Sequence, residues 1–353
     1  MKNKNLLIIT QTVDERDSNL GFFCGWLREF SKQADKVYVI ANKVGEYNLP
    51  DNVVVSSLKK EEDISRFKRI FIFWSLLFKY LPKVRSVLIH MCPEYIVYGG
   101  WVARLFGKKV GIWYLHKSLT WKLKLSHIIT NYVFTAHIDG FPIKSHKVIA
   151  TGHGIDLNIF SNIESREVSP RLVSLGMKDD EFVMLTVGRV SSSKNLLILV
   201  KSVIILQKKL DKKVRFLIVG EPYLDEDREY LEELKSYLKR EQEEELVEFV
   251  GKVPYENIVE YYKRADLFLN ASRTGGVDKA VLEAMASGLP VITSNFTFKN
   301  ILPENCLFED GDLNDLVEKI TKYKEINTDS LRDAVFKNHS LESTVEQIIK
   351  KLL

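Results

Sequence analysis

A short run from Gly188 to Asn195 holds chemistry for binding an anion, because Arg189 and Lys194 flank a serine-rich turn that enters an apolar helix. Backbone N–H groups at the start of a helix, together with the positive end of its dipole, favour an anion. Arg189 and Lys194 could therefore neutralise a diphosphate, including the charge that develops on it as a leaving group. The alternative is a solvated turn that carries two surface cations.

A second run, residues 271–292, combines glycines with charged residues at helical spacing. Gly276 lets the backbone approach a ligand closely, and Glu283 could accept hydrogen bonds from two ribose hydroxyls. Glu283 also follows Lys279 by one helical turn, so the two could form an ordinary surface ion pair; Lys279 could instead reach a diphosphate or an acidic sugar. Asp278 could supply a carboxylate to the same site or act only as the N-cap of the helix.

Both runs must be positioned by parallel sheets, because short apolar, β-rich segments alternate with helical patterns along the chain. In such sheets ligands bind at the carboxyl ends of strands, and both runs directly follow an expected strand. Strands are expected at residues 6–10, 36–40, 53–56, 87–90, 110–115, 148–151, 182–187, 214–219, 246–250, 267–270 and 291–293. Helices are expected between the later strands, at residues 195–210, 226–244, 255–264 and 278–287.

The length of 353 residues suits two domains rather than one. The alternation of strands and helices restarts near residue 182, after a polar stretch. We therefore predict an α/β protein with two doubly wound domains. The N-terminal domain is expected over residues 1–165 and the C-terminal domain over residues 166–339, with a helix at about 340–353 that could pack back on the first domain.

The composition, with 45% hydrophobic and 28% charged residues, is that of a globular chain rather than a disordered or fibrous one. The three cysteines are far apart and follow no metal-ligand spacing, so we expect no disulfide framework and a reducing, cytoplasmic location. No stretch reaches the roughly 18 to 20 apolar residues that a transmembrane helix requires, and the apolar run at 6–10 is too short for a signal peptide.

The net charge of +4 is unevenly distributed: residues 1–165 hold 23 Lys and Arg against 14 Asp and Glu, a surplus of +9, and the rest sums to −5. Within the basic half, Ser65 to Arg85 contains six basic residues, six aromatic residues and no acidic residue. Such a segment suits the surface of an anionic membrane; the alternative is a buried helix whose cations extend outwards. No nucleic-acid partner is expected, because no nucleic-acid-binding module is recognisable.

Together and in this order, the two runs resemble the large E-x7-E family of retaining GT-B glycosyltransferases, the glycosyl transferases group 1. The resemblance extends over most of the chain and includes the run Leu282 to Val291, the run Gly152 to Asp156 with Phe160, and Gly251 to Pro254. It implies two Rossmann-like domains facing a central cleft. It also implies transfer of a sugar from a UDP- or GDP-sugar to a glycan or lipid-linked acceptor, in cell-surface polysaccharide or glycolipid synthesis.

Residue by residue, the resemblance implies that Arg189 and Lys194 bind the donor diphosphate and that Glu283 binds the ribose. His116, at the end of the strand expected at 110–115, resembles the family's active-site histidine, which touches the transferring sugar; His90 is the second candidate. The other positions implied in donor binding are Gly21 after the first strand, Gly188, Val253 beside the base, Gly276, Val277 and Lys279.

The sequence departs from the family at Gly275, which stands where the first glutamate of the E-x7-E motif is expected. The usual contact to the sugar hydroxyls is therefore missing or moved, and Asp278 is the candidate replacement. The departure also favours an alternative on the same fold: a nucleotide-sugar epimerase or a nucleotide-sugar-binding module without activity.

The mechanism that the resemblance implies is front-face retention, with His116, Arg189, Lys194 and Asp278 as the catalytic set. The departing phosphate accepts the proton of the acceptor while Arg189 and Lys194 stabilise the leaving diphosphate. We expect no metal and no other cofactor, because fixed cations meet the phosphate charge.

Overall fold

The computed structural model describes residues 4–161, 178 and 180–353. They fold into two units, each built around a parallel sheet. The first unit runs to Asp156 and also includes Pro254–Glu256 and Asn338–Leu353; the second contains the described residues of Leu157–Val253 and Asn257–Lys337. The boundary predicted at residue 165 lies outside the described residues, and the contacts divide the chain after Asp156.

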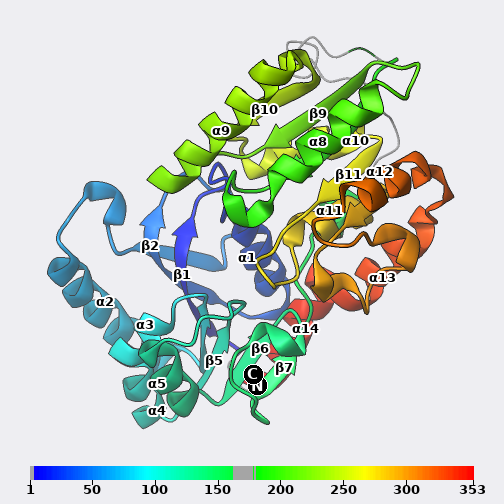
Figure 1. The fold of residues 1–353 in the computed structure, drawn as a ribbon. Helices are drawn as coiled ribbons and strands as arrows, with labels where there is room; N and C mark the ends of the chain where they lie inside the picture. Colours follow the sequence, from blue (N-terminus) through cyan, green and yellow to red (C-terminus); the bar gives the residue numbers. More distant parts are fainter. Residues whose placement is uncertain (1–3, 162–177, 179) are drawn as a thin grey trace. The chain divides into compact units, whose positions relative to one another are not determined.

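The first unit contains a seven-stranded parallel sheet with the order β3-β2-β1-β4-β5-β6-β7 (Figure 1). The chain extends the sheet in one direction from β1 and then in the other from β4, so the strand order reverses between these two strands. The strands are β1 (Leu6–Val13), β2 (Val37–Val44), β3 (Val53–Ser57), β4 (Ser86–His90), β5 (Lys109–Trp113), β6 (Tyr132–Thr135) and β7 (Val148–Ala150).

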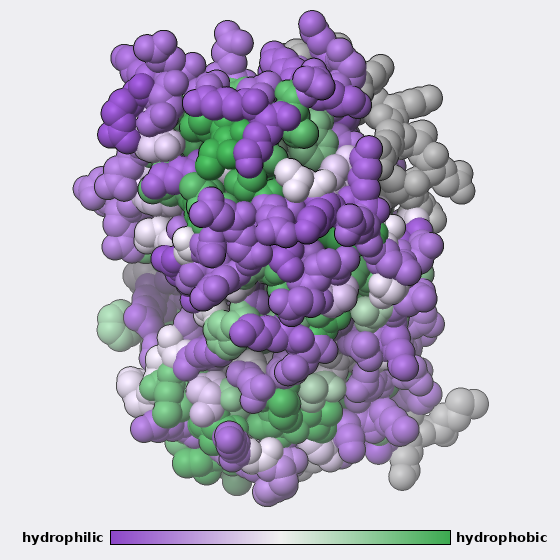
Figure 2. All heavy atoms as spheres, turned by 45° about the vertical axis from the view of Figure 1, so that its right-hand side comes forward, coloured by the Kyte–Doolittle hydropathy of each residue, from purple (hydrophilic) through white to green (hydrophobic). Residues whose placement is uncertain are grey.

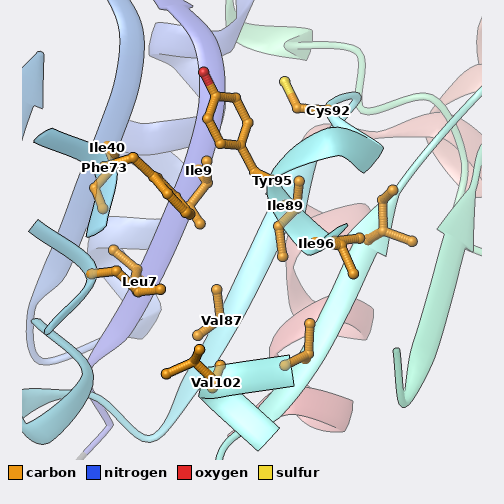
Figure 3. Close-up of a cluster of buried hydrophobic side chains, with 14 of the residues drawn as sticks. Leu7, Ile9, Ile40, Phe73, Val87, Ile89, Cys92, Tyr95, Ile96 and Val102 are labelled. Carbon is orange, nitrogen blue, oxygen red and sulfur yellow. The ribbon is translucent and has the colours of Figure 1, made fainter. Parts of the chain in front are cut away.

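Helices cover both faces of this sheet, which explains why the central strands are near-continuous apolar runs. On one face, α1 (Phe22–Gln33) packs with α14 (Leu341–Leu352), the helix expected at about 340–353. The other face carries α2 (Arg66–Tyr80), α3 (Pro93–Tyr95), α4 (Trp101–Leu105) and α5 (Trp121–Ile129). Figure 3 shows the core on this second face, where Phe73, Tyr95 and Val102 lie among strand residues such as Leu7 and Val87.

The second unit contains a five-stranded parallel sheet with the order β10-β9-β8-β11-β12. Its strands are β8 (Phe182–Val187), β9 (Val214–Val219), β10 (Val247–Gly251), β11 (Leu267–Asn270) and β12 (Val291–Thr293). Its helices are α6 (Leu157–Phe160), α8 (Leu196–Gln207), α9 (Asp225–Glu241), α10 (Ile258–Arg264), α11 (Lys279–Ala286), α12 (Leu313–Thr321) and α13 (Thr328–His339), the last of which belongs to this unit as far as Lys337.

The structure adds elements that the sequence patterns did not indicate. β6 has only four residues and follows α5 closely, so it offers too short a pattern for a periodic signal. The helix expected at 255–264 begins with a separate 3₁₀ turn, Tyr255–Asn257, and continues as α10. The helices α12 and α13 were also not predicted.

Candidate functional site

The two runs singled out in the sequence lie next to each other in the second unit, because they follow adjacent strands. Gly188 follows β8, residues 271–278 follow β11, and the two strands pair in parallel. The strand order reverses between them, with β9 and β10 on one side and β12 on the other. The runs therefore meet at the switch point of the sheet, where open α/β sheets bind ligands.

Lys194 reaches from the first run to the second. It ends a 3₁₀ turn, Ser192–Lys194, and Asn195 follows in the left-handed conformation (φ 48°), from which α8 starts. Its Nζ lies 2.7 Å from Oδ1 of Asp278 and 3.4 Å from Oγ of Ser272. The side chain is 19% exposed, so it lies at the edge of solvent rather than in the core.

Asp278 receives hydrogen bonds from three segments of the second unit. Lys194 donates to its Oδ1, while the side-chain amides of Asn270 and Asn295 donate to its Oδ2 at 3.1 and 3.2 Å. Asp278 stands at the N-cap position of α11, as its residue type suggests, but its side chain makes no capping hydrogen bond. The carboxylate faces the site instead.

Asn270 and Asn295 were missed by the sequence analysis. Oδ1 of Asn270 accepts from Oγ1 of Thr293 at 2.9 Å, which fixes the amide so that its Nδ2 faces Asp278. Asn295 also donates to the carbonyl oxygen of Gly276 at 2.8 Å. Both asparagines stand at or just after the carboxyl end of a strand, and this position is the signal that could have found them.

Glu283 is buried on α11 between Lys279 and Tyr262. Lys279 Nζ pairs with its Oε1, and the Tyr262 hydroxyl donates to its Oε2 at 3.0 Å. Burial and the Glu283 carboxylate raise the pKa of Tyr262 well above its ordinary value, so the phenol stays protonated. The ion pair expected from the helical spacing forms, but it is buried rather than on the surface, with the Glu283 side chain only 4% exposed. Lys279 Nζ also lies 5.9 Å from the centre of the Phe160 ring.

Arg189 faces a different acidic residue. Its Nε lies 3.7 Å from Oδ2 of Asp227, and its side chain is 44% exposed. Asp227 is buried in the first turn of α9, where its Oδ2 accepts from the backbone N–H groups of Tyr223 and Leu224. Arg189 and Lys194 thus each have a carboxylate partner, and the sequence did not indicate either pairing.

The backbone of the loop at 271–278 explains the glycine at its centre. Gly275 has φ 71°, in the left-handed region that strains any residue with a Cβ atom. A glutamate at this position would be held in that strained conformation. Gly276 follows without a positive φ, and Val277 is buried. Val253, the other residue expected near the ligand in this unit, is buried after β10.

Two candidates of the first unit occupy loops at the carboxyl ends of its strands. Gly21 precedes α1, and a Cβ atom there would lie 2.5 Å from the carbonyl oxygen of Asp17, so the close backbone approach requires glycine. His116 is exposed in the segment after β5, and its Nδ1 accepts from the backbone N–H of Ser118 at 3.0 Å.

His90 lies in the core of the first unit. Its ring stacks on Phe23 with 4.1 Å between centroids, and its Nδ1 lies 3.2 Å from Oγ1 of Thr10. Burial, with the nearby His153 as a smaller cause, lowers the pKa of His90 to about 3. A neutral, enclosed ring of this kind is part of the packing, whereas His116 can meet a ligand.

Residues 181–325 match the family model described as Glycosyl transferases group 1. The alpha-monoglucosyldiacylglycerol synthase of Streptococcus pneumoniae is 30% identical over 175 residues, which are 48% of this chain and 37% of that protein. The UDP-Gal:alpha-D-GlcNAc-diphosphoundecaprenol alpha-1,3-galactosyltransferase of Escherichia coli is 30% identical over 197 residues, which are 54% of this chain and 48% of that protein. The chain thus spans less than half the length of these two relatives.

Solved structures resemble the whole chain. Anabaena HepE in complex with UDP has a TM-score of 0.74 at 17% identity and covers 99% of both chains. The sucrose-phosphate synthase of Thermosynechococcus elongatus has a TM-score of 0.69 at 18% identity, over 99% of this chain and 98% of that one. At these identities the likeness concerns the fold alone. With two parallel Rossmann-like sheets, the chain has the GT-B fold that the sequence predicted.

Proposed function

The chain belongs to the glycosyl transferases group 1 family through residues 181–325, and on this premise we propose that it transfers a sugar from a nucleotide-sugar to a glycan or lipid-linked acceptor. The observation that carries the proposal is the Lys194–Asp278 pair at the switch point of the second sheet. An enzyme that releases a nucleoside diphosphate needs fixed positive charge where the leaving group forms.

The donor diphosphate is assigned to Lys194, Arg189 and the first turn of α8. Asp278 pairs with Lys194, and Asp227 lies near Arg189. A diphosphate carries more negative charge than either carboxylate and accepts charge-assisted hydrogen bonds from both cations, so it competes for them. Because two side chains and a helix N-terminus supply the positive charge, the proposal includes no metal ion.

The nucleoside is assigned to Glu283 and to the backbone near Val253. Lys279 and Tyr262 hold the Glu283 carboxylate in place. Each carboxylate oxygen has two lone pairs, so Glu283 can accept ribose hydroxyls in addition to its present donors. A carboxylate that is fixed beforehand loses little conformational freedom on binding.

The sugar is assigned to Asp278 and His116. Asp278 provides the carboxylate that Gly275 cannot, and His116, exposed after β5, is the histidine that the family resemblance assigns to the sugar. In the proposed front-face reaction, the bond between the anomeric carbon and the phosphate oxygen breaks as the bond to the acceptor oxygen forms on the same face. The leaving phosphate takes the acceptor proton, and Lys194 and Arg189 stabilise the negative charge that remains.

The names of the similar proteins support the choice of donor and acceptor. HepE was solved in complex with UDP and with UDP-glucose, and the Escherichia coli relative is named for UDP-Gal and a diphosphoundecaprenol-linked sugar. We therefore favour a UDP-sugar over a GDP-sugar, and a lipid-linked acceptor over a soluble glycan. A cytoplasmic location with peripheral membrane contact at Ser65 to Arg85 belongs to the same proposal.

The test is a donor panel in which the purified protein receives UDP- or GDP-sugars, with and without lipid-linked acceptors. We expect free UDP to appear only when an acceptor is present, and the product to keep the anomeric configuration of the donor. The turnover should persist in EDTA.

Other outcomes of the panel would count against the proposal. A change of the sugar without an acceptor would identify an epimerase, and tight binding without any turnover would identify a binding module. Loss of turnover in EDTA that Mg²⁺ or Mn²⁺ restores would contradict the metal-independent mechanism.

A further inference from the structure

Three helices of the first unit expose large apolar side chains on one surface. The most exposed are Phe67 (79%) and Phe71 on α2, Leu105 (77%) at the end of α4, and Trp121 and Ile128 (71%) on α5. We call the outward surface of α2, α4 and α5 the helical face. Buried side chains on the inner sides of these helices, such as Phe73, Val102 and Leu123, anchor them to the sheet, so the exposure is not caused by loose packing.

The helical face is continuous from helix to helix. The rings of Trp74 on α2 and Trp101 on α4 are 6.0 Å apart between centroids, and those of Phe78 and Phe106 are 6.3 Å apart. Trp101, Leu105 and Ile128 line one shallow pocket that joins α4 to α5. In Figure 1 the three helices lie together at one side of the first unit. In Figure 2 apolar side chains come to the surface in the lower part of the view.

The positive charge of the helical face indicates that its partner carries negative charge. Residues 64–138, which include all three helices, contain twelve Lys and Arg but only one acidic residue, Glu94. Exposed cations surround the apolar side chains, among them Arg66, Lys68, Lys79, Arg104 and Lys124. The pocket between α4 and α5 also has Arg104, His146 and Lys147 in its lining. A partner that covers this face must therefore be anionic and apolar at once.

An anionic lipid bilayer meets both conditions. Its phosphates accept hydrogen bonds from Lys and Arg, its acyl region receives Leu and Ile side chains, and Trp is favoured at the boundary between the two. A nucleic acid would match the cations but would leave Leu105 and Ile128 without a stacking partner. None of the helices in the described residues is long and apolar enough to span a bilayer.

We propose that the helical face inserts its apolar side chains into the interface of an anionic bilayer while its cations bind lipid phosphates. This deepens the proposed function, on which it rests for the identity of a lipid-linked acceptor. It goes beyond a purely electrostatic contact at Ser65 to Arg85, because α4 and α5 take part and because apolar insertion resists salt. Binding should weaken as salt screens the cations, yet a salt-resistant part should remain.

Flotation with vesicles tests the proposal, using phosphatidylcholine alone or mixed equally with phosphatidylglycerol, in low salt and in 0.5 M NaCl. The double variant Leu105→Gln/Ile128→Gln should lower partitioning at least about tenfold in high salt, because two exposed apolar side chains no longer insert. Lys68→Gln/Lys124→Gln should lower it mainly in low salt. Tyr223→Gln is the matched control, because Tyr223 is 70% exposed but lies in the second unit, and it should float as the wild type does.

A second readout reports insertion directly. Trp121 is exposed, so brominated lipid should quench part of the wild-type tryptophan emission, and Trp121→Phe should lose the share of that quenching that Trp121 contributes. Equal melting temperatures confirm that the variants fold.

Three results would overturn the proposal. They are a wild type that never floats with anionic vesicles, a Leu105→Gln/Ile128→Gln variant that floats as well as the wild type in high salt, and binding to single-stranded nucleic acid without flotation. Turnover of a short-chain, water-soluble acceptor separates this proposal from the proposed function. If the apolar double variant loses flotation but keeps that turnover, both stand; if the wild type floats but never turns over, only the proposed function fails.

Discussion

Lys194 and Asp278 form the centre of the candidate site at the scale of single residues. Two asparagines fix the carboxylate, and the carboxylate in turn orients the ammonium. A lysine with a flexible side chain would otherwise lose conformational freedom on binding a phosphate. Asp278 is therefore expected to prepare the position of Lys194 before a donor arrives.

Replacing Lys194 by alanine should lower kcat about 100-fold, because one charge-assisted contact to the leaving diphosphate is lost. Asp278→Asn should lower kcat by a smaller factor, because the Lys194 ammonium remains although it is held less firmly. Lys208→Ala is the matched control, because it removes the same charge at the other end of α8. Steady-state kinetics at saturating donor measure the effects, and an unchanged kcat for Lys194→Ala would contradict the assignment.

Replacing Glu283 by glutamine should weaken binding of the nucleotide-sugar about tenfold. The ribose hydroxyls would then donate hydrogen bonds to a neutral amide instead of a charged carboxylate, and such bonds are weaker. Binding of pyrophosphate, which has no ribose, should change little. Titration calorimetry with both ligands measures the difference. If both affinities fall equally, Glu283 acts through Lys279 and the diphosphate rather than through the ribose.

At the scale of elements, the loop between β11 and α11 and the helix α2 show how local geometry decides between alternatives. The loop holds Gly275 at φ 71°, which accounts for the glycine in a place where the family motif has a glutamate. The helix α2 buries Phe73, Leu77 and Tyr80 and exposes Phe67 and Phe71. The segment Ser65 to Arg85 is thus neither wholly buried nor wholly exposed, and its outward side is the part that a membrane could meet.

Replacing Gly275 by alanine should lower the free energy of unfolding by about 1 kcal/mol, because the left-handed conformation strains a residue with a Cβ atom. Gly276→Ala is the matched control in the same loop. Gly276 has no positive φ, and nothing lies within 4 Å of the position of its Cβ. Urea denaturation measures both variants, and equal stabilities would show that the loop adapts. For the same reason, Gly275→Glu should not raise the activity.

At the scale of the whole molecule, buried histidines link stability to pH. Burial lowers the pKa of His90 to about 3 and that of His339 to about 4. In the unfolded chain a histidine titrates near 6.5. Below about pH 6.5 the unfolded state therefore binds more protons than the folded state, and the free energy of unfolding decreases as the pH is lowered. Above that pH these histidines add no pH dependence.

His90 should therefore leave the melting temperature of the protein unchanged with pH above about pH 6.5. As the pH is lowered from there towards 3, His90 should lower the melting temperature. The loss is at most about 1.4 kcal/mol per pH unit for each such histidine. His90→Phe should flatten this slope, because phenylalanine can occupy the aromatic cluster without titrating. His146→Phe, at an exposed position, should leave the slope unchanged. Parallel curves for wild type and His90→Phe would show that His90 does not titrate on unfolding.

The sequence by itself determined the class of fold and indicated candidate residues for the site. Apolar runs at strand length, separated by helical patterns, can bury their side chains only in parallel sheets covered on both faces. Charged residues in the two runs that follow strands indicated Lys194, Asp278 and Glu283 as candidates. These signals are local, so they can be read without knowledge of the neighbours.

Only the tertiary structure decided which of these residues meet. Lys194 and Asp278 are 84 positions apart, and Asn295 joins them from after a third strand. Their contacts depend on β11 pairing with β8 and with β12, and periodicity does not specify strand order. The orientation of α2 and the burial of His90 were undetermined for the same reason: an apolar or aromatic side chain is buried or exposed according to what packs against it, and that packing comes from distant parts of the chain.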